Sequence, residues 1–297
     1  MENVFIVYPL AFFQKEGISM KRFAGIFFLI VAILSFTGCG TPEEKPAPPP
    51  VKDDPAVTDV AVYYIKYSDT DMYLVREVHT VKETSRILET AVQELIRGTP
   101  QTKGAFAVLP PDTEVLEISV ADKLATVNFS KEVLNANAGA GGEALGIQSI
   151  VNTLTEFTEI DRVAFEVEGT LDERSKDWWG HVGLGQQPFT RDLSNVWEPP
   201  IWVNEPVSNQ TVSSPLTVQG SARVFEATVN LRLLSDDGKI LGETFATATE
   251  GAPGRGEFEA IIGYVPPSDA KGTLEVFWIS PKDGSETDKV QIPLQFN

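Results

Sequence analysis

The stretch ILETAVQELI, residues 87–96, decides the fold class of the first half of the chain. Its apolar side chains recur at i, i+1, i+4, i+5, i+8 and i+9, and they are Ile87, Leu88, Ala91, Val92, Leu95 and Ile96. That spacing places them on one face of an amphipathic helix. Residues 80–83 fit a capping box at the start of this helix, and Gly98 followed by Pro100 ends it.

Two strands precede this helix. Alternating apolar residues at 60–64 and 73–75 predict the strands, and the polar segment between them predicts a turn. Asp69 and Asp71 lie in that turn. An EF-hand calcium loop would need a glycine and a distal glutamate that are absent here, so we assign both aspartates to turn chemistry.

Further strands and a second helix follow. Residues 115–129 predict two strands joined tightly at Asp122-Lys123, and residues 139–142 predict a loop of small residues. A second amphipathic helix carries Ile147, Ile150, Val151, Leu154 and Phe157. With a last strand at 163–167, these elements predict an α+β domain over residues 58–192, with a mixed sheet and two helices.

The last hundred residues have a different pattern. Short β-rich segments recur at 201–204, 216–221, 228–234, 240–247, 257–264, 273–279 and 290–296. Hairpin turns are predicted at 236–238 and 282–284, and Pro199-Pro200 marks the domain boundary. About seven short strands predict an immunoglobulin-like β-sandwich over 199–297. Because no cysteine pair links its sheets, we expect packing by Phe225, Leu231, Phe258, Phe277 and their neighbours.

The N-terminal region has the pattern of an export signal. Lys21 and Arg22 precede an apolar run at 23–36 that is short for a membrane span. Small residues then lead to Cys39 and resemble a lipobox, which implies cleavage after residue 38 and a diacylglyceryl group on Cys39. We expect translation to start at Met20, because residues 1–19 add nothing that a signal peptide needs. Residues 39–57 are rich in proline and predict an extended spacer.

The charge and cysteine content exclude several function classes. The formal net charge is −18, and removing residues 1–38 leaves a net charge of −19. Such a field repels phosphate backbones, so nucleic acid is not an expected partner. The single cysteine, Cys39, excludes an internal disulfide and a cysteine-based metal site.

Two sets of motifs resemble known families. The first set comprises 73–75, 95–100, 111–113, 125–130, 148–155 and 167–169, and the second comprises 214–222, 224–228, Phe258 and 280–285. The order of the first set is similar to that of GerMN domains, although Gly98-Thr99-Pro100 stands where Gly-Pro is usual. The second set resembles the immunoglobulin-like domain of bacterial spore-germination proteins. The resemblance implies a role in sporulation or germination.

The sequence contains no recognisable catalytic motif. Only two histidines are present, and we expect His79 to lie at the surface or rim of its domain. We expect no catalytic residues, no cofactor and no metal site, because paired carboxylates arise by chance among 42 acidic residues. Trp178 and Trp179, followed by His181, lie in a polar segment and form the candidate binding surface.

These observations favour a non-enzymatic scaffold or interaction module anchored through Cys39 to the extracytoplasmic face of the cell membrane. The expected partners are the membrane itself and other envelope proteins. A second hypothesis is a binding module for cell-wall glycan (peptidoglycan) or a small ligand, using Trp178 and Trp179. A third, a wall hydrolase, has no motif in its favour.

Overall fold

The computed structural model describes residues 56–267 and 270–297, which belong to one compact unit spanning Asp53–Asn297. The predicted export signal at 1–38 and the lipidation site Cys39 lie outside the described residues. So does nearly all of the predicted spacer at 39–57.

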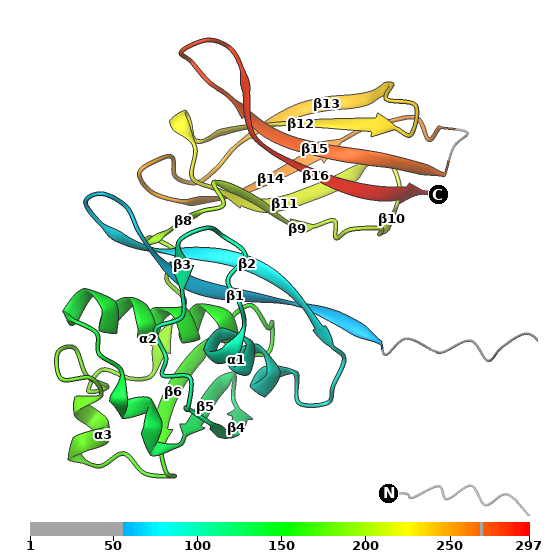
Figure 1. Ribbon diagram of the computed structural model, residues 1–297. Coiled ribbons are helices and arrows are strands. Elements are labelled where there is room, and N and C mark those ends of the chain that lie inside the picture. Colours follow the sequence, from blue (N-terminus) through cyan, green and yellow to red (C-terminus); the bar gives the residue numbers. More distant parts are fainter. Residues whose placement is uncertain (1–55, 268–269) are drawn as a thin grey trace, which may run out of the picture. The chain divides into compact units, whose positions relative to one another are not determined.

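The first domain begins with a β-hairpin. Strand β1 (Val57–Tyr67) pairs antiparallel with β2 (Met72–Lys82), and the predicted turn joins them. Short strands complete this sheet: β3 (Ala105–Phe106) lies beside β1, and β8 (Val196–Glu198) pairs parallel with β2. Figure 1 shows this hairpin in blue and cyan.

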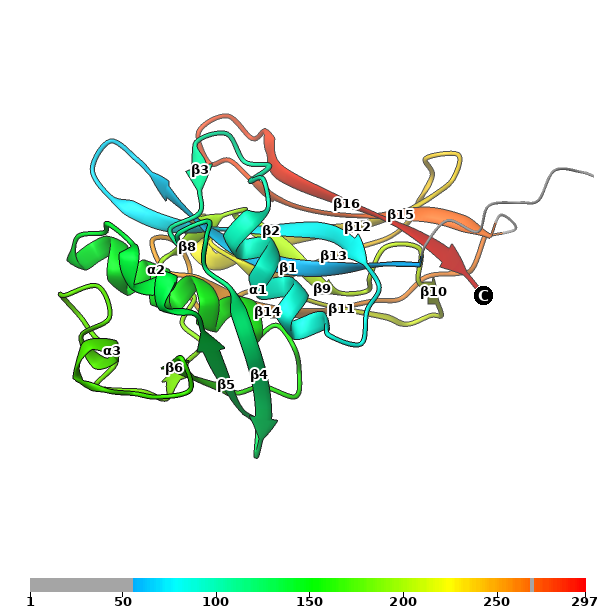
Figure 2. The ribbon, with the colours of Figure 1, turned by 60° about the horizontal axis from the view of Figure 1, so that its bottom comes forward.

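A second sheet of the first domain has the order β4-β5-β6-β7. Its strands are β4 (Val115–Ala121), β5 (Leu124–Phe129), β6 (Arg162–Val167) and β7 (Phe189–Thr190). The predicted hairpin is confirmed, with Asp122 and Lys123 at φ 50° and 60° as a tight primed turn requires. In Figure 2, β4 and β5 run side by side. The α+β class is confirmed, and its strands form two mixed sheets.

Helices α1 (Ile87–Arg97) and α2 (Ala140–Leu154) contact strands of both sheets and lie between them (Figure 1). The main core joins α1 and α2 to alternate residues of β1, namely Val60, Val62 and Tyr64, and to β5 and β6. A 3₁₀ helix, η1, spans Lys131–Asn135, and a short helix, α3, spans Glu173–Asp177.

Two local predictions about helix starts are wrong. The capping box at 80–83 does not cap α1, because β2 continues to Lys82 and the N-cap residue is Arg86, which makes no side-chain cap. The small-residue loop at 139–142 is shorter than expected, because α2 already begins at Ala140. In both cases the pairing or packing of the segment overrides its local preference.

The C-terminal domain is a sandwich of two sheets, ordered β10-β16-β15-β12-β13 and β14-β11-β9. All seven predicted strands are present. They are β9 (Ile201–Glu205), β11 (Leu216–Ala222), β12 (Thr228–Ser235), β13 (Ile240–Thr247), β14 (Gly256–Ile262), β15 (Lys271–Ile279) and β16 (Glu286–Phe296). The short strand β10 (Thr211–Val212) and the 3₁₀ helix η2 (Phe225–Ala227) were not predicted.

The sandwich core contains some of the expected residues. Leu231 and Phe258 lie in it, as predicted. Phe225 does not, because it is 50% exposed at η2. Phe277 is buried outside this core cluster, beneath the side chains of Arg232 and Lys289, whose charged groups lie 4.9 and 5.3 Å from its ring centre.

The remaining face of the first sheet is buried at the junction of the two domains. A separate cluster unites Tyr63, Ile65, Leu74, Leu145, Val196 and Trp202. Trp202 belongs to β9, so the C-terminal domain supplies part of the cover. Its ring lies 3.9 Å from Cζ of Arg255 and 5.2 Å from Cζ of Arg76.

Arg255 is buried without a carboxylate partner among the described residues. Instead it donates to backbone carbonyls, including those of Val196 at 3.0 Å and Pro199 at 2.6 Å. Burial lowers the pKa of Arg255 to about 9, which leaves the guanidinium charged near neutral pH. Trp202 and the backbone carbonyls of residues 196–200, the linker between the two domains, thus stabilise a buried cation that fixes the junction.

We expect Trp202→Ala to lower the free energy of unfolding by about 3–5 kcal/mol, because it opens a cavity beside Arg255. Urea denaturation of the wild type and the variant measures this difference. Phe245→Ala is the matched control, because Phe245 is 67% exposed, and such surface changes stay within about 0.5 kcal/mol. Equal losses for the two variants would contradict the assigned role of Trp202.

Candidate functional site

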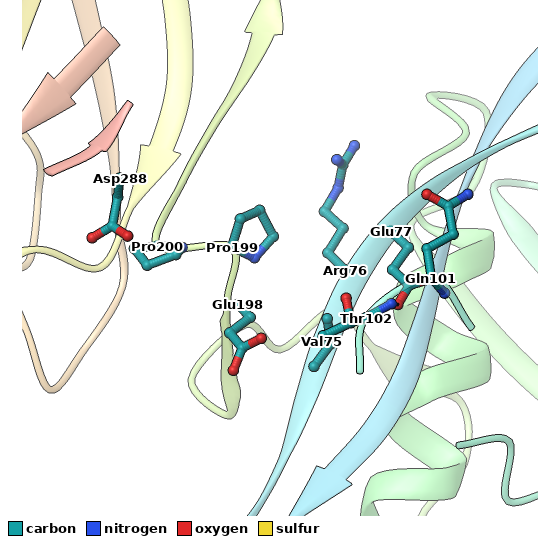
Figure 3. A pocket seen from close by; sticks show the side chains of 9 residues that line it. All are labelled: Val75, Arg76, Glu77, Gln101, Thr102, Glu198, Pro199, Pro200 and Asp288. Carbon is teal, nitrogen blue, oxygen red and sulfur yellow. The ribbon is translucent and has the colours of Figure 1, made fainter. Parts of the chain in front are cut away.

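A pocket of about 610 Å³ lies where β2, the segment after α1, and the linker meet. It is lined by Val75, Arg76, Glu77, Gln101, Thr102, Glu198, Pro199, Pro200 and Asp288 (Figure 3). Its volume falls in the range of small-molecule sites. It was not predicted, because its lining comes from four segments that are distant in the sequence.

The carboxylates that line this pocket are engaged in internal contacts. Glu77 accepts from the backbone N–H groups of Gln101 and Thr102, both at 2.7 Å. Glu198 accepts from Lys66 at 2.8 Å and from the Tyr73 hydroxyl. Asp288 accepts from Nε1 of Trp278 at 2.7 Å. Each of the three carboxylates therefore accepts at least one hydrogen bond from within the protein.

Beside the pocket, His79 is buried between two carboxylates, which contradicts the expected position at the surface or rim. Its Nε2 lies 2.8 Å from Oε2 of Glu77, and its Nδ1 lies 2.7 Å from Oε1 of Glu94. The imidazole is 4% exposed. It therefore connects β2, which carries both His79 and Glu77, to Glu94 of helix α1.

The two contacts of His79 require an additional proton. A neutral imidazole has one N–H group and cannot donate to both carboxylates. Burial opposes the charged form, but hydrogen bonds to Glu94 and Glu77 outweigh it and raise the pKa of His79. Burial also disfavours ionised Glu77, yet its backbone donors and His79 outweigh this and lower the pKa of Glu77. The favoured species is an imidazolium between two carboxylates.

This arrangement gives stability a defined pH dependence. An ordinary histidine has a pKa of about 6.5 in the unfolded chain, and folding raises the value for His79. Its contribution is therefore complete below the unfolded pKa and is lost as the pH rises through the folded pKa. We expect the free-energy difference between wild type and His79→Gln to shrink as the pH rises from about 6.5 through the raised folded pKa of His79.

Urea denaturation across that range, with an NMR titration of the His79 ring, measures this effect. His181→Gln is the control, because His181 is exposed. A constant difference between wild type and His79→Gln at every pH would contradict the imidazolium assignment.

A second buried ionic cluster surrounds Glu156. Its carboxylate pairs with Arg76 at 3.0 Å and with Arg191 at 2.5 Å, and it accepts from the hydroxyl of Tyr63. Burial raises the pKa of Glu156, but the two arginines outweigh this and lower it to about 2. The cluster links both strands of the first hairpin to the segment after α2, which indicates a structural role.

The expected exposure of Trp178 and Trp179 is contradicted. They are 4% and 8% exposed and belong to the main core of the first domain. Trp178 lies 5.6 Å from Phe165, measured between ring centres, and Nε1 of Trp179 donates to the carbonyl of Val133 at 2.8 Å. Sugar rings cannot stack on indoles that are already covered, so the glycan hypothesis loses its surface.

One sequence feature, Gly146, accounts for the buried position of Trp179. A Cβ at Gly146 would lie 2.5 Å from Cζ3 of Trp179, so glycine in helix α2 makes room for the indole. The polar residues before the pair form α3, after which Trp178 takes a φ of 52°. The polar flank therefore marked a short surface helix and not an exposed aromatic pair.

His181, the third residue of the predicted surface, is exposed. Its backbone N–H donates to Glu143 at 2.8 Å, and the N–H of Gly183 donates to the same carboxylate at 2.7 Å. Glu143 is fully buried in the first turn of α2. It therefore anchors the loop that follows the tryptophans, a role that sequence reasoning missed.

Metal binding and membrane spanning find no support in the part of the chain that the structure describes. Within residues 56–267 and 270–297, no group of three or more histidine, cysteine or acidic side chains could hold a metal ion. None of the helices in these ranges is long and apolar enough to cross a membrane.

Comparison with known families agrees with the two-domain assignment. Residues 61–173 match the family "Sporulation and spore germination", and residues 200–285 match the "Immunoglobulin-like domain of bacterial spore germination". The chain therefore contains one domain of each family, in the order that the resemblance predicted.

Similar proteins include the spore germination protein GerM of Bacillus subtilis (strain 168). It is 30% identical over 131 residues, which cover 42% of this chain and 33% of that protein. The chain thus matches only about a third of the length of GerM.

Solved structures with similarity include the first GerMN domain of B. subtilis GerM, at 26% identity and a TM-score of 0.37, covering 46% of this chain and 96% of that one. A putative lipoprotein from Clostridium perfringens has 24% identity and a TM-score of 0.32, covering 46% of this chain and 89% of that one.

Proposed function

We propose that this protein is a non-enzymatic lipoprotein of the cell envelope that presents binding surfaces to other envelope proteins during sporulation or germination. Both of its domains belong to families named for these processes. The lipid anchor, the scaffold role and the absence of catalysis are the parts that we add.

The observation that carries the proposal is that the buried histidine and glutamate side chains of the first domain are engaged in contacts within the protein. Glu77 and Glu94 both contact His79 beside the pocket, and Glu156 is held by two arginines. Catalysis needs an acid, base or nucleophile that can exchange protons with a substrate. Because these groups serve the fold, interaction is a better supported role than turnover.

The extracytoplasmic location is inferred from the predicted signal at 1–38 and from Cys39. A thioether-linked diacylglycerol carries two acyl chains and would thus provide the two hydrophobic signals that stable anchoring requires. The extended spacer at 39–57 would then separate the two domains from the bilayer.

Mass spectrometry of the protein isolated from membranes tests the anchor. We expect an N-terminal peptide that begins with diacylated Cys39, and we expect Cys39→Ser to lose this modification. Thr41→Ser, which keeps the cysteine, is the matched control. An unmodified Cys39 preceded by the intact apolar run would contradict the lipoprotein assignment.

Incubation with purified peptidoglycan tests the absence of catalysis. We expect the detergent-solubilised protein to release no soluble wall fragments above the level of buffer alone, because its buried acidic groups are engaged. Release that depends on Glu77 or Glu156, lost in variants that remain folded, would show a hydrolase and overturn the non-enzymatic proposal.

A further inference from the structure

Arg223 stands out against the charge of the chain. Acidic residues outnumber lysine and arginine by 42 to 24. Nevertheless, no carboxylate pairs with Arg223 among the described residues. Burial lowers the pKa of its guanidinium, and no neighbouring charge offsets this effect. Nε of Arg223 donates to the carbonyl of Pro253 at 2.8 Å. Its two terminal nitrogens have no hydrogen-bond partner within the described part of the chain.

The guanidinium of Arg223 is held in place by an aromatic side chain. Its Cζ lies 4.7 Å from the ring centre of Trp197. The ring of Tyr73 stacks on the same indole at 4.6 Å, with 12° between the planes. Arg223 and Trp197 are both half-buried, so the guanidinium and the indole both remain partly accessible. The stacking and the Nε bond together orient the free end of the guanidinium before any partner binds.

Further positive charge surrounds this group. Repulsion by Arg223 and Arg76 helps to lower the pKa of Arg255, after the larger effect of burial. Arg255 spends its donors on linker carbonyls and brings no carboxylate with it. The guanidinium groups of Arg223 and Arg255 therefore lie beside the linker without a carboxylate partner among the described residues, whereas Glu198 of the linker is paired with Lys66.

We propose that Arg223 binds a carboxylate of a partner polypeptide, with the half-buried ring of Trp197 as the adjoining aromatic contact. Tyr73 is itself buried and supports the indole by stacking on it. The planar guanidinium fork matches a carboxylate in a bidentate geometry. Tryptophan, tyrosine and arginine are also the residues enriched at interface hot spots. A polyanion such as a phosphate polymer is disfavoured, because the net charge of −18 repels it as a whole. This inference rests on the proposed interaction role and gives that role a location.

Zero-length carbodiimide coupling in the native membrane tests the site, because it joins an amine only to a carboxylate in direct contact. Arg223→Lys places an amine there in the full-length protein. We expect Lys-to-carboxylate cross-links between position 223 and Asp, Glu or a C-terminus of one partner protein. Arg86→Lys is the control, because Arg86 is exposed and already paired with Glu89 at 3.1 Å.

Several outcomes would overturn the site. The site would be contradicted if position 223 coupled only to carboxylates of this chain or only to wall stem peptides. It would also be contradicted if position 223 coupled to other proteins no more often than position 86 does. Cross-links from native lysines to envelope proteins, without any from position 223, would leave the interaction role intact and reject only this site. Cross-links from no position at all would count against the interaction role as well.

A binding measurement with the identified partner guards against misfolding of the lysine variant. We expect Arg223→Ala to weaken binding about tenfold or more while leaving the melting temperature within a few degrees of the wild type. Arg86→Ala should leave binding unchanged. Unchanged affinity of folded Arg223→Ala would contradict the proposal.

Discussion

Strand β1 must be covered on both faces, and the rest of the structure follows from this constraint. Val60, Val62 and Tyr64 lie in the main core, whereas Tyr63 and Ile65 lie in the cluster at the junction. Helices α1 and α2 cover the first set. The linker and Trp202 help to cover the second set, so the C-terminal domain completes the burial of the first domain. Each fully buried large apolar side chain gains about 1.5–3 kcal/mol.

Buried charges fix the segments that hydrophobic contacts bring together. Arg255 binds the linker carbonyls, Glu143 binds the loop after the tryptophans, and His79 joins β2 to α1. Removing one partner of a buried charge pair costs about 3–5 kcal/mol, whereas an exposed ion pair contributes at most about 1 kcal/mol. The few buried charges therefore matter more for the architecture than the exposed pairs, such as Lys123–Asp161.

Whether a charged group is paired within the protein also bears on its function. A histidine between two carboxylates would suggest acid–base chemistry in an accessible cleft. Here the carboxylate of Glu77 is occupied by backbone N–H groups as well, so the cluster has the character of a structural joint. Arg223 is the contrasting case, since its charge is oriented but unpaired within the described residues. That contrast is why we propose Arg223, beside the linker, as the site for a partner carboxylate.

Local periodicity predicted helices α1 and α2, the hairpins, and all seven longer strands of the sandwich, because these patterns depend on neighbouring residues. The failures involve long-range contacts. Trp179 fills space that Gly146 leaves open in a different element, and Trp178 packs against Phe165. His79 occupies an inward position on β2 while its neighbour Val78 is 46% exposed, an inversion that signals a buried polar network. The alternation at 60–64 predicted strand β1, but not that both of its faces are covered.

We expect the two domains to behave as one cooperative unit, because they share the junction around Trp202. Differential scanning calorimetry of the whole protein measures this cooperativity. We expect one unfolding transition, with equal calorimetric and van't Hoff enthalpies. Two separate transitions, or a calorimetric enthalpy well above the van't Hoff value, would show that the domains unfold independently and would contradict the claim.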